Sequence, residues 1–402
     1  MHIAILSPSD RSIIKQFLPN QEHDNLPIGY TGAPFIGILI KELLSQNHQV
    51  TAITTNAAIN NDYTVKKYCS GNFSWIVVPQ RPHSFRMNEK KLGYMIDFFS
   101  DEQSQMLNCI RDNSPDFIHA HWSYEFAGAA VKSGIPCLVT VHDNANKILL
   151  YFKNLYRFGR LLMAEHILKQ VRFASTVSPY MRTYTEKRCA AVKVIANPVI
   201  IDTDSAEISN NVINKIDNLT APRLIMINNG WNGRKNGLSA LLAFKLLQQQ
   251  HPNATLHLYG QGTVPNGLAC QNALELNLNN VNYYGPIPHD ELMVELKKAH
   301  FLIHPALEES FGVVLIEAMS YGIPVIGGKN SGAVPWVIND KRLLVDVTKP
   351  KQITQKIITL INEPSLYQQI SHQAYDNVVS RFSSKSVTDA YINYYHEILA
   401  TW

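Results

Sequence analysis

The sequence has few cysteines, and their arrangement excludes two common kinds of site. The five cysteines of this 402-residue chain are scattered, with no CxxC pair and no cluster of His and Cys. This pattern argues against a disulfide framework or a zinc site and fits a reducing cytoplasm. The first residues, MHIAILSPSD, lack a basic region followed by an apolar one, so we interpret them as a strand and not as a signal peptide. No apolar stretch approaches the length of a transmembrane helix.

Several enzyme motifs are also missing. There is no HExxH metal motif, no Walker lysine loop and no GxSxG nucleophile elbow. The first loop has no GxGxxG pattern and no acidic residue is well placed after the second predicted strand, which argues against a nicotinamide enzyme. The formal net charge of +4 is too small to indicate nucleic-acid binding, although it is compatible with an anionic ligand or membrane surface.

What the sequence does contain is a regular alternation of short apolar strands and amphipathic helices. Such alternation predicts parallel sheets covered by helices on both faces. A first set of strands is expected at 2–6, 49–54, 74–79, 116–121, 136–142, 174–178 and 193–199, with a helix at 34–48. The pattern restarts with strands at 222–230, 254–262, 281–287, 300–305 and 324–328 and a helix at 238–250. Since 402 residues exceed one usual core, we predict two doubly wound α/β domains.

The predicted domain boundary lies near residue 198. The first domain is expected to cover residues 1–198 and the second residues 199–382, with the polar segment 199–222 as a linker and a final helix at 383–402. Two such domains that face each other create a cleft, in which ligands bind beyond the carboxyl ends of the strands. The loops expected to carry the chemistry are 29–33, 119–124, 142–146, 228–236, 260–263, 285–289, 305–312 and 327–333.

The segment HPALEESFGVVLIE, residues 304–317, gives the strongest indication of a binding site. A strand is expected to end at His304 and a helix to begin near Gly312. The amides of Phe311, Gly312 and Val313 would then lie at a helix N-terminus, which favours a phosphate.

Two glutamates flank these amides. Glu317 lies about 7 Å further along the helix, among apolar residues where a carboxylate needs a partner, and a ribose diol would suit it. Glu309 would face the group on the far side of the phosphates. Alternatively, they are an exposed helix residue and a residue that complements the helix dipole, but the apolar neighbours and the strand–turn–helix context favour the binding site.

A second candidate is the loop NNGWNGRKNG, residues 228–237. Arg234 and Lys235, placed by turns at Gly233 and Gly237, suit a diphosphate and would neutralise charge on a leaving nucleotide. The alternative is a solvated basic turn, which would be the preferred interpretation of this loop alone.

Histidines mark a third candidate, PDFIHAHWSYEFAG at residues 115–128. His119 and His121 are expected to point to opposite faces of a strand, one toward the core and one toward the mouth of the cleft. A single strand histidine is more often structural than functional. The same caution applies to His142 and Asp143.

A fourth candidate is a basic amphipathic helix at residues 147–172. Lys153, Arg157 and Arg160 follow helical spacing among Leu, Phe and Tyr residues. Such a helix can lie on an anionic membrane surface. A surface helix whose apolar stripe belongs to the core explains the pattern equally well.

Three of these stretches resemble the family 4 retaining glycosyltransferases, which have the GT-B fold of two Rossmann-like domains facing a central cleft. EESFGVVLIEAMSYGIPVIGG is similar to the family's E-x7-E element, PDFIHAHWSYEFAG with GIPCLVTVHD to its N-domain strand pair, and NGWNGRKNGLSALLAF to its basic loop. Weaker similarity extends from Met1 to about residue 345. The resemblance implies that residues 1–198 are the acceptor-side domain, with the helix 383–402 packed back on it, and that residues 199–382 bind the nucleotide sugar.

The resemblance also implies roles for individual residues. Glu309 contacts hydroxyls of the donor sugar, Glu317 the ribose, and Arg234 and Lys235 the diphosphate, while His121 matches a histidine near the transferred sugar. The other implied donor-binding residues are Gly32 near the phosphates, Ile287 by the base, Phe311, Gly312 and Val313 through their amides, and Asn229, Gly230 and Ser310. There are two departures: Trp231 stands where many members have arginine, so that Arg234 would substitute, and Trp336 replaces a common glutamate.

The implied activity is transfer of a sugar from a nucleotide sugar, a UDP- or GDP-sugar, with retained configuration and no obligatory metal or cofactor. The expected acceptor is a glycan or a polyprenyl-diphosphate-linked glycan, in the synthesis of O-antigen, capsule or exopolysaccharide. We expect a cytoplasmic enzyme, at the inner face of the membrane if the basic helix binds there, and no nucleic-acid partner. Two alternatives are a non-catalytic GT-B protein that binds nucleotide or glycan, and a nucleotide-sugar epimerase or hydrolase on the same scaffold.

Overall fold

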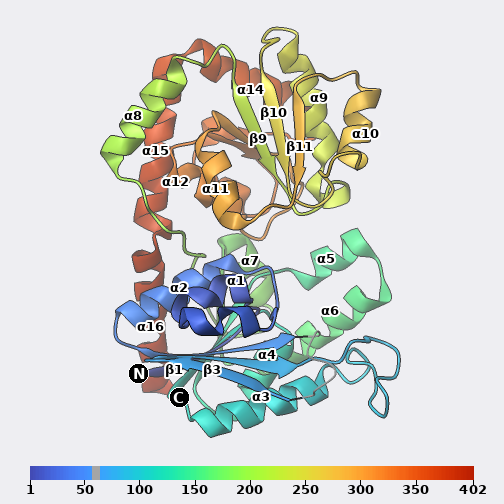
Figure 1. Cartoon of the computed structure of the whole chain (residues 1–402), viewed down its shortest axis with the longest axis vertical. Helices are drawn as coiled ribbons and strands as arrows, with labels where there is room; N and C mark the ends of the chain where they lie inside the picture. Colours follow the sequence, from blue (N-terminus) through green and yellow to red (C-terminus); the bar gives the residue numbers. More distant parts are fainter. Residues whose placement is uncertain (57–63) are drawn as a thin grey trace. The chain divides into compact units, whose positions relative to one another are not determined.

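The computed structural model describes residues 1–56 and 64–402, which fall into two compact units (Figure 1). Unit 1 comprises Met1–Pro198 together with Ser384–Trp402, and unit 2 comprises Val199–Ser383. Each unit is built around one sheet, with helices on its faces. The predicted fold class, two doubly wound α/β domains in series, is confirmed.

The sheet of unit 1 has the strand order β3-β4-β2-β1-β5-β6-β7-β8. Its strands are β1 (His2–Leu6), β2 (Gln49–Asn56), β3 (Lys66–Ser70), β4 (Phe73–Pro79), β5 (Phe117–His121), β6 (Cys137–Val141), β7 (Phe173–Thr176) and β8 (Ala191–Val194). All neighbours are parallel except β3, which pairs antiparallel with β4. The sequence did not predict β3, because this edge strand has no fully buried residue and therefore no apolar run.

The helices of unit 1 cover both faces of this sheet. They are α1 (Arg11–Ile14), α2 (Pro34–Ser45), α3 (Ser100–Asn113), α4 (Glu125–Ser133), α5 (Ala145–Phe152), α6 (Leu155–Leu168), α7 (Pro179–Thr185) and α16 (Ser384–Thr401), with 3-10 turns at Lys15–Phe17 and Asn20–Asn25. Helix α2 begins at Pro34, whose fixed φ suits a first helical turn, and buries Ile36, Leu39, Ile40 and Leu43. It ends before the predicted residue 48 because Asn47 is left-handed, with φ of 61°.

The sheet of unit 2 has the order β11-β10-β9-β12-β13-β14, with every neighbouring pair parallel. Its strands are β9 (Arg223–Ile227), β10 (Thr255–Tyr259), β11 (Val281–Gly285), β12 (Phe301–His304), β13 (Val325–Gly328) and β14 (Leu344–Val345). Its helices are α8 (Ser205–Ile216), α9 (Gly237–Gln248), α10 (Leu268–Glu275), α11 (His289–Lys297), α12 (Val313–Ser320), α13 (Val334–Ile338), α14 (Pro350–Asn362) and α15 (Pro364–Phe382), with 3-10 turns at Gly233–Lys235 and Lys341–Leu343.

Half of the predicted linker 199–222 is helical, because it contains the 12-residue helix α8. Asp204 caps α8 by accepting a hydrogen bond from the amide of Glu207, and Ile208 and Val212 are buried where α8 packs on α15. Only these two side chains of α8 are buried, and most of the others are polar. The segment therefore has no long apolar pattern from which the helix could be predicted.

The predicted basic helix 147–172 is two helices. Lys153 adopts a left-handed conformation that ends α5, and the Asn154 side chain caps α6 by accepting from the amide of Arg157. Arg160 does not belong to an exposed basic face, because it is buried and ion-paired with Glu125. The prediction that Lys153, Arg157 and Arg160 share one exposed basic face is therefore wrong for Arg160.

The last helix, α16, belongs to unit 1, where it packs on α2 and β6. The Tyr395 hydroxyl lies 2.7 Å from Nδ1 of His119 on β5, and Gln46 Nε2 donates to Asp389 Oδ1 at 3.0 Å. The chain therefore leaves unit 1 after residue 198 and returns to it at residue 384.

We predict that Tyr395→Phe destabilises unit 1. The substitution removes the hydroxyl partner of His119 Nδ1 from a buried site, and a buried polar group that loses its hydrogen bond costs about 1–3 kcal/mol. The free energy of unfolding from urea denaturation should fall by that amount. Tyr151→Phe, at an exposed tyrosine of α5, is the matched control and should change it by less than about 0.5 kcal/mol. Equal stability of Tyr395→Phe and the wild type would contradict the prediction.

Candidate functional site

The direction of the chain across the sheet of unit 2 changes between β9 and β12. From β9 the chain moves outward to β10 and β11, and it then returns to β12 on the other side of β9. The loops after β9 and β12 therefore diverge, and such a switch point is where ligands bind in open α/β sheets. The predicted site segments 228–236 and 305–312 are these two loops.

Side chains of opposite charge join the two loops. Lys235 Nζ donates to Oε1 of Glu309, and Arg234 Nη1 lies 3.6 Å from Oε2 of the same carboxylate. Arg234 Nη1 also donates to the carbonyl oxygen of Glu308 at 2.9 Å, and the amide of Leu307 donates to the carbonyl of Arg234 at 2.8 Å. The structure thus brings Arg234, Lys235 and Glu309 into contact.

Burial and ion pairing have opposite effects on the ionisation of Glu309. Burial alone would raise the pKa of this carboxyl group, but its interactions with Lys235, His304 and Arg234 outweigh burial and lower the pKa to about 2. His304, at the end of β12, has its Nε2 3.7 Å from Glu309 Oε1, and burial lowers the pKa of His304 to about 4. At neutral pH the site therefore holds two cations, a carboxylate and a neutral imidazole.

Helix α12 begins beside this charge cluster. Gly312 precedes it with a φ of 86°, and a Cβ at that position would lie 2.9 Å from the side chain of Leu315 and 3.9 Å from Cγ of Glu309. Glycine is therefore required both by the left-handed backbone and by the close packing. The Leu315 amide donates to the Gly312 carbonyl at 3.0 Å, whereas the amides of Val313 and Val314 have no preceding carbonyl in the helix and carry the positive end of its dipole.

Glu317, further along α12, has a partner that the sequence did not reveal. Its Oε1 lies 2.8 Å from Nε2 of His289, the first residue of α11. This hydrogen bond raises the pKa of His289, and burial opposes the increase. His289 directly follows the loop that contains Ile287, so it lies where the base was expected.

The prediction that His119 and His121 point to opposite faces is wrong. Residues two apart on a strand lie on the same face, and the two ring centroids are 4.0 Å apart. His119 is held by Thr140 Oγ1 and the Tyr395 hydroxyl, each at 2.7 Å. His121 Nδ1 lies 2.9 Å from Nε2 of His142, whereas its own buried Nε2 has no hydrogen-bond partner among residues 1–56 and 64–402.

Burial keeps these three histidines neutral. It lowers the pKa of His119 and His121 well below the usual value and that of His142 to about 3. Both ring nitrogens of His119 have partners, so that residue is structural. His121 keeps one buried ring nitrogen, Nε2, without a hydrogen-bond partner in the described residues, and sequence reasoning missed the contact of its Nδ1 with His142.

The remaining predicted residues have varied surroundings. Gly32 has a φ of 112°, and no described atom lies within 4 Å of where its Cβ would be, so its backbone is accessible. The amide of Gly230 is engaged, because it donates to the carbonyl of Gln261 at 3.0 Å. The ring of Phe311 is buried edge-to-face against Phe382, which leaves its backbone for binding. Asn229, Ile287 and Ser310 lie in the loops after β9, β11 and β12.

Both tryptophans that depart from the family pattern are structural. Trp231 is buried, its Nε1 donates to Asn272 Oδ1 at 2.9 Å, and its ring lies 2.5 Å from where a Cβ of Gly237 would be. Trp336 packs edge-to-face on Phe382, and the Arg381 guanidinium lies 4.6 Å from its ring centroid.

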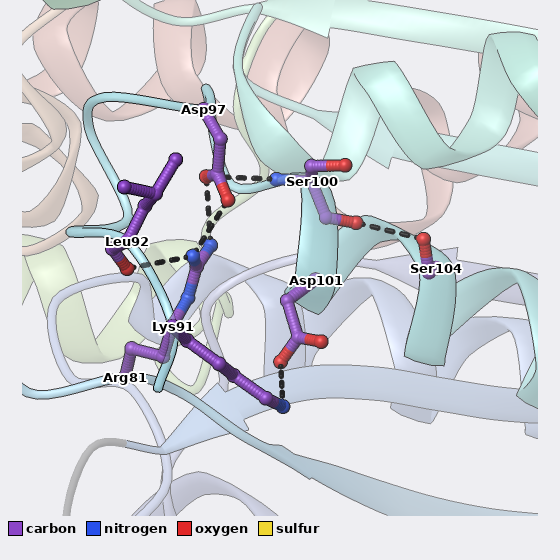
Figure 2. A pocket seen from close by; sticks show the side chains of 7 residues that line it. All are labelled: Arg81, Lys91, Leu92, Asp97, Ser100, Asp101 and Ser104. Atoms are coloured by element: carbon purple, nitrogen blue, oxygen red, sulfur yellow. Dashed lines mark hydrogen bonds and ion pairs between the residues drawn. The ribbon is translucent and has the colours of Figure 1, made fainter. Parts of the chain in front are cut away.

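A separate pocket of about 270 Å³ lies in unit 1 (Figure 2). Its lining residues are Arg81, Lys91, Leu92, Asp97, Ser100, Asp101 and Ser104. Arg81 donates to both oxygens of Asp97 at 2.7 and 2.8 Å and to the buried Glu102 at 2.6 Å, and Lys91 pairs with Asp101 at 2.8 Å. Because these charges pair with one another, we interpret the pocket as a structural junction between the segment 82–99 and α3.

Within residues 1–56 and 64–402, no group of three or more His, Cys, Asp or Glu side chains is placed to hold a metal ion. In the same residues, no helix combines the length and apolar character needed to cross a membrane.

Two family models match this chain. Residues 35–203 match the one described as Glycosyltransferase Family 4, and residues 214–377 match the one described as Glycosyl transferases group 1.

Several curated proteins are similar to parts of the chain. Glycogen synthase of Mycobacterium tuberculosis is 26% identical over 152 residues, which is 38% of this chain and 37% of that protein. An uncharacterized glycosyltransferase of Methanocaldococcus jannaschii, MJ1178, is 23% identical over 328 residues, or 75% of this chain and 80% of that one. The capsular polysaccharide biosynthesis glycosyltransferase CapM of Staphylococcus aureus is 34% identical over 98 residues, 24% of this chain and 26% of CapM. The match to glycogen synthase thus spans little more than a third of that protein's length.

Solved structures share the fold over the whole chain. Sucrose-phosphate synthase from Thermosynechococcus elongatus has a TM-score of 0.72 at 16% identity and covers 100% of both chains. Anabaena HepE in complex with UDP and glucose has a TM-score of 0.68 at 16% identity and covers 99% of this chain and 100% of that one. These are GT-B proteins, which agrees with the predicted fold class.

We predict that His289→Gln removes a pH-dependent part of the stability. Because Glu317 raises the pKa of His289 in the folded protein, the charged pair contributes fully below the pKa of an unfolded histidine, about 6.5. That contribution is lost as the pH rises through the higher folded pKa. The melting temperature of the wild type should exceed that of the variant by more at about pH 5.5 than at about pH 8.5. His166→Gln, at an exposed histidine, is the control, and a difference independent of pH would count against the pair.

Proposed function

Because the chain belongs to glycosyltransferase family 4, we propose that it transfers a sugar, with retention of configuration, from a nucleotide sugar to a glycan or lipid-linked glycan. The observation that carries this proposal is the contact of Arg234 and Lys235 with Glu309 beside the first turn of α12. Cations, helix amides and a carboxylate within one site are what a diphosphate joined to a sugar requires.

In this proposal each group of the site binds one part of the donor. The amides from Phe311 to Val313, together with Arg234 and Lys235, bind the diphosphate. Glu317 accepts hydrogen bonds from the ribose hydroxyls, and Glu309 accepts them from the sugar on the opposite side of the phosphates. Glu309 pairs with both cations, so donor binding would move Lys235 and Arg234 from the carboxylate to the phosphates.

The donor-binding set is completed by residues outside this cluster. His121 would use its unpartnered Nε2 near the transferred sugar, and the accessible backbone of Gly32 would approach the phosphates. Asn229, Gly230, Ile287 and Ser310 complete the proposed donor-binding residues. The proposed donor is a UDP- or GDP-sugar, and the complex of HepE with UDP and glucose supports the first of these.

For the chemical step we propose departure and attack on the same face of the sugar. The bond from the anomeric carbon to the diphosphate oxygen breaks as the acceptor oxygen attacks, and the departing phosphate oxygen takes the acceptor proton. Arg234, Lys235 and the amides of α12 would stabilise the charge that develops on the leaving diphosphate. The step is proposed to need neither a metal nor a cofactor, since these groups supply the positive charge.

We further propose that the acceptor belongs to a surface polysaccharide, such as an O-antigen, capsule or exopolysaccharide, and that the enzyme works at the cytoplasmic face of the membrane. The similarity of part of the chain to CapM, a capsular polysaccharide biosynthesis enzyme, supports this assignment. Donor consumption measured with and without candidate acceptors tests the proposed transferase activity. Turnover independent of acceptor would favour an epimerase or hydrolase, and binding without turnover would favour a non-catalytic protein.

We predict that Glu317→Ala weakens donor binding. A thermal-shift screen against UDP-, GDP- and ADP-sugars should identify a stabilising donor, and loss of the ribose contact should raise its Kd about 10–100-fold. Glu291→Ala, at an exposed glutamate of α11, is the matched control and should bind like the wild type. If Glu317→Ala binds the donor as tightly as the wild type, the ribose assignment is wrong.

Glu309→Gln should separate binding from turnover. The variant keeps the size of the side chain but releases Lys235 and Arg234 from a competing carboxylate, so the donor Kd should stay the same or decrease. Loss of the charged contact to the sugar should lower kcat about 10²–10³-fold. Glu291→Gln is the control, and a thermal melt checks that the variant is folded. A normal kcat in Glu309→Gln would exclude the proposed role of this carboxylate.

A further inference from the structure

One side of unit 1 exposes large apolar side chains in close succession. On α5 and α6 these are Leu150, Phe152, Leu155, Phe158 and Leu162, of which Leu150 is 62% exposed and Leu155 is 66% exposed. We call these five residues the apolar surface. A soluble protein rarely leaves a contiguous apolar patch of this kind without a partner.

Helix α6 carries two apolar stripes, and only one of them is used for packing. Met163, Ala164 and Ile167 are buried against unit 1. Leu155, Phe158 and Leu162 follow the spacing i, i+3, i+7 and are all exposed. The helix therefore presents one apolar face to the core and a second to the outside.

The segment 82–99 extends this surface. Tyr94 meets Tyr156 edge-on with ring centroids 6.5 Å apart, and the side chain of Met95 lies 3.1 Å from where a Cβ of Gly159 would be. The segment therefore packs against α6, and the exposed Ile96 and Phe98 follow Met95 in sequence. The ion pairs of Arg81 fasten the same segment to α3 (Figure 2).

The charges around the apolar surface are positive. Lys147 and Lys153 are exposed, and the guanidinium of Arg157 lies 5.3 Å from the ring centroid of Phe152. The one acid of residues 145–168 that could offset them, Glu165, is already paired with Arg188. The turn at Lys153 places a cation between Phe152 and Leu155.

We propose that the apolar surface rests on an anionic lipid bilayer. Its Leu and Phe side chains would enter the interfacial region, and Lys147, Lys153 and Arg157 would meet the lipid phosphates. A protein partner fits less well, because lysine is depleted from the apolar core of protein interfaces, whereas here it lies among the apolar residues. A membrane is where the lipid-linked acceptor proposed above resides, and to that extent the inference rests on the proposed function.

Flotation of the full chain with vesicles tests the proposal. Vesicles of phosphatidylcholine with phosphatidylglycerol should bind the wild type, and Leu155→Ser/Phe158→Ser should weaken that binding about tenfold. Lys147→Gln/Lys153→Gln should also weaken it, and binding should decrease with salt. Leu274→Ser, at a leucine of unit 2 that is 68% exposed, and Lys245→Gln are matched controls that should bind like the wild type. Arg160 is left intact because it is buried.

Three results would overturn the proposal. The wild type could fail to float with anionic vesicles, the Leu155→Ser/Phe158→Ser variant could float as well as the wild type, or light scattering could show a dimer that this variant dissociates in the absence of vesicle binding. Donor consumption with a water-soluble acceptor, measured on the same variants, should stay unchanged. If the wild type floats but never consumes donor, the proposed transferase activity fails while the membrane surface stands.

Discussion

The candidate site depends on the contact of one buried carboxylate, Glu309, with the two cations of another loop. Glu309 and Lys235 are 74 residues apart in sequence, and only the adjacency of β9 and β12 brings them together. The low pKa of Glu309 reflects how strongly the cations oppose the cost of burying it. The same contact positions the loop that leads into α12. The charged side chains and the amides at the start of α12 therefore belong to one site. Removal of either partner would leave a buried charge without compensation.

The two units offer contrasting chemistry. In unit 2 the low pKa of Glu309 keeps this carboxylate charged beside Lys235 and Arg234, and in unit 1 the histidines at the end of β5 and after β6 are neutral because they are buried. A charged set would suit the proposed diphosphate, whereas a neutral imidazole would suit the hydroxyls of the proposed sugar. Both groups are buried, and their partners make the difference. Glu309 is paired with cations, whereas Nδ1 of His121 contacts another imidazole.

The sequence revealed the parts of the fold that are marked by local patterns. Central strands such as β1 are buried on both faces and appear as apolar runs, so they were predicted, whereas the half-exposed β3 and the mostly polar α8 were not. The break between α5 and α6 depends on a left-handed lysine, which no residue preference would indicate. For the site, Glu309 and Glu317 were visible because a short segment holds them. The partner of Glu317, His289 on α11, was not identified, because contacts between distant elements leave no local pattern.

The position of α16 has a consequence for how the protein is made. The contact between His119 and Tyr395 spans 276 residues. His119 on β5 therefore cannot form this hydrogen bond until residue 395 has left the ribosome. Unit 2, by contrast, is contiguous in sequence from Val199 to Ser383 and can complete its core first. The unit synthesised first would therefore be finished last, and a chain truncated before α16 would contain a complete unit 2 and a unit 1 that lacks its final helix.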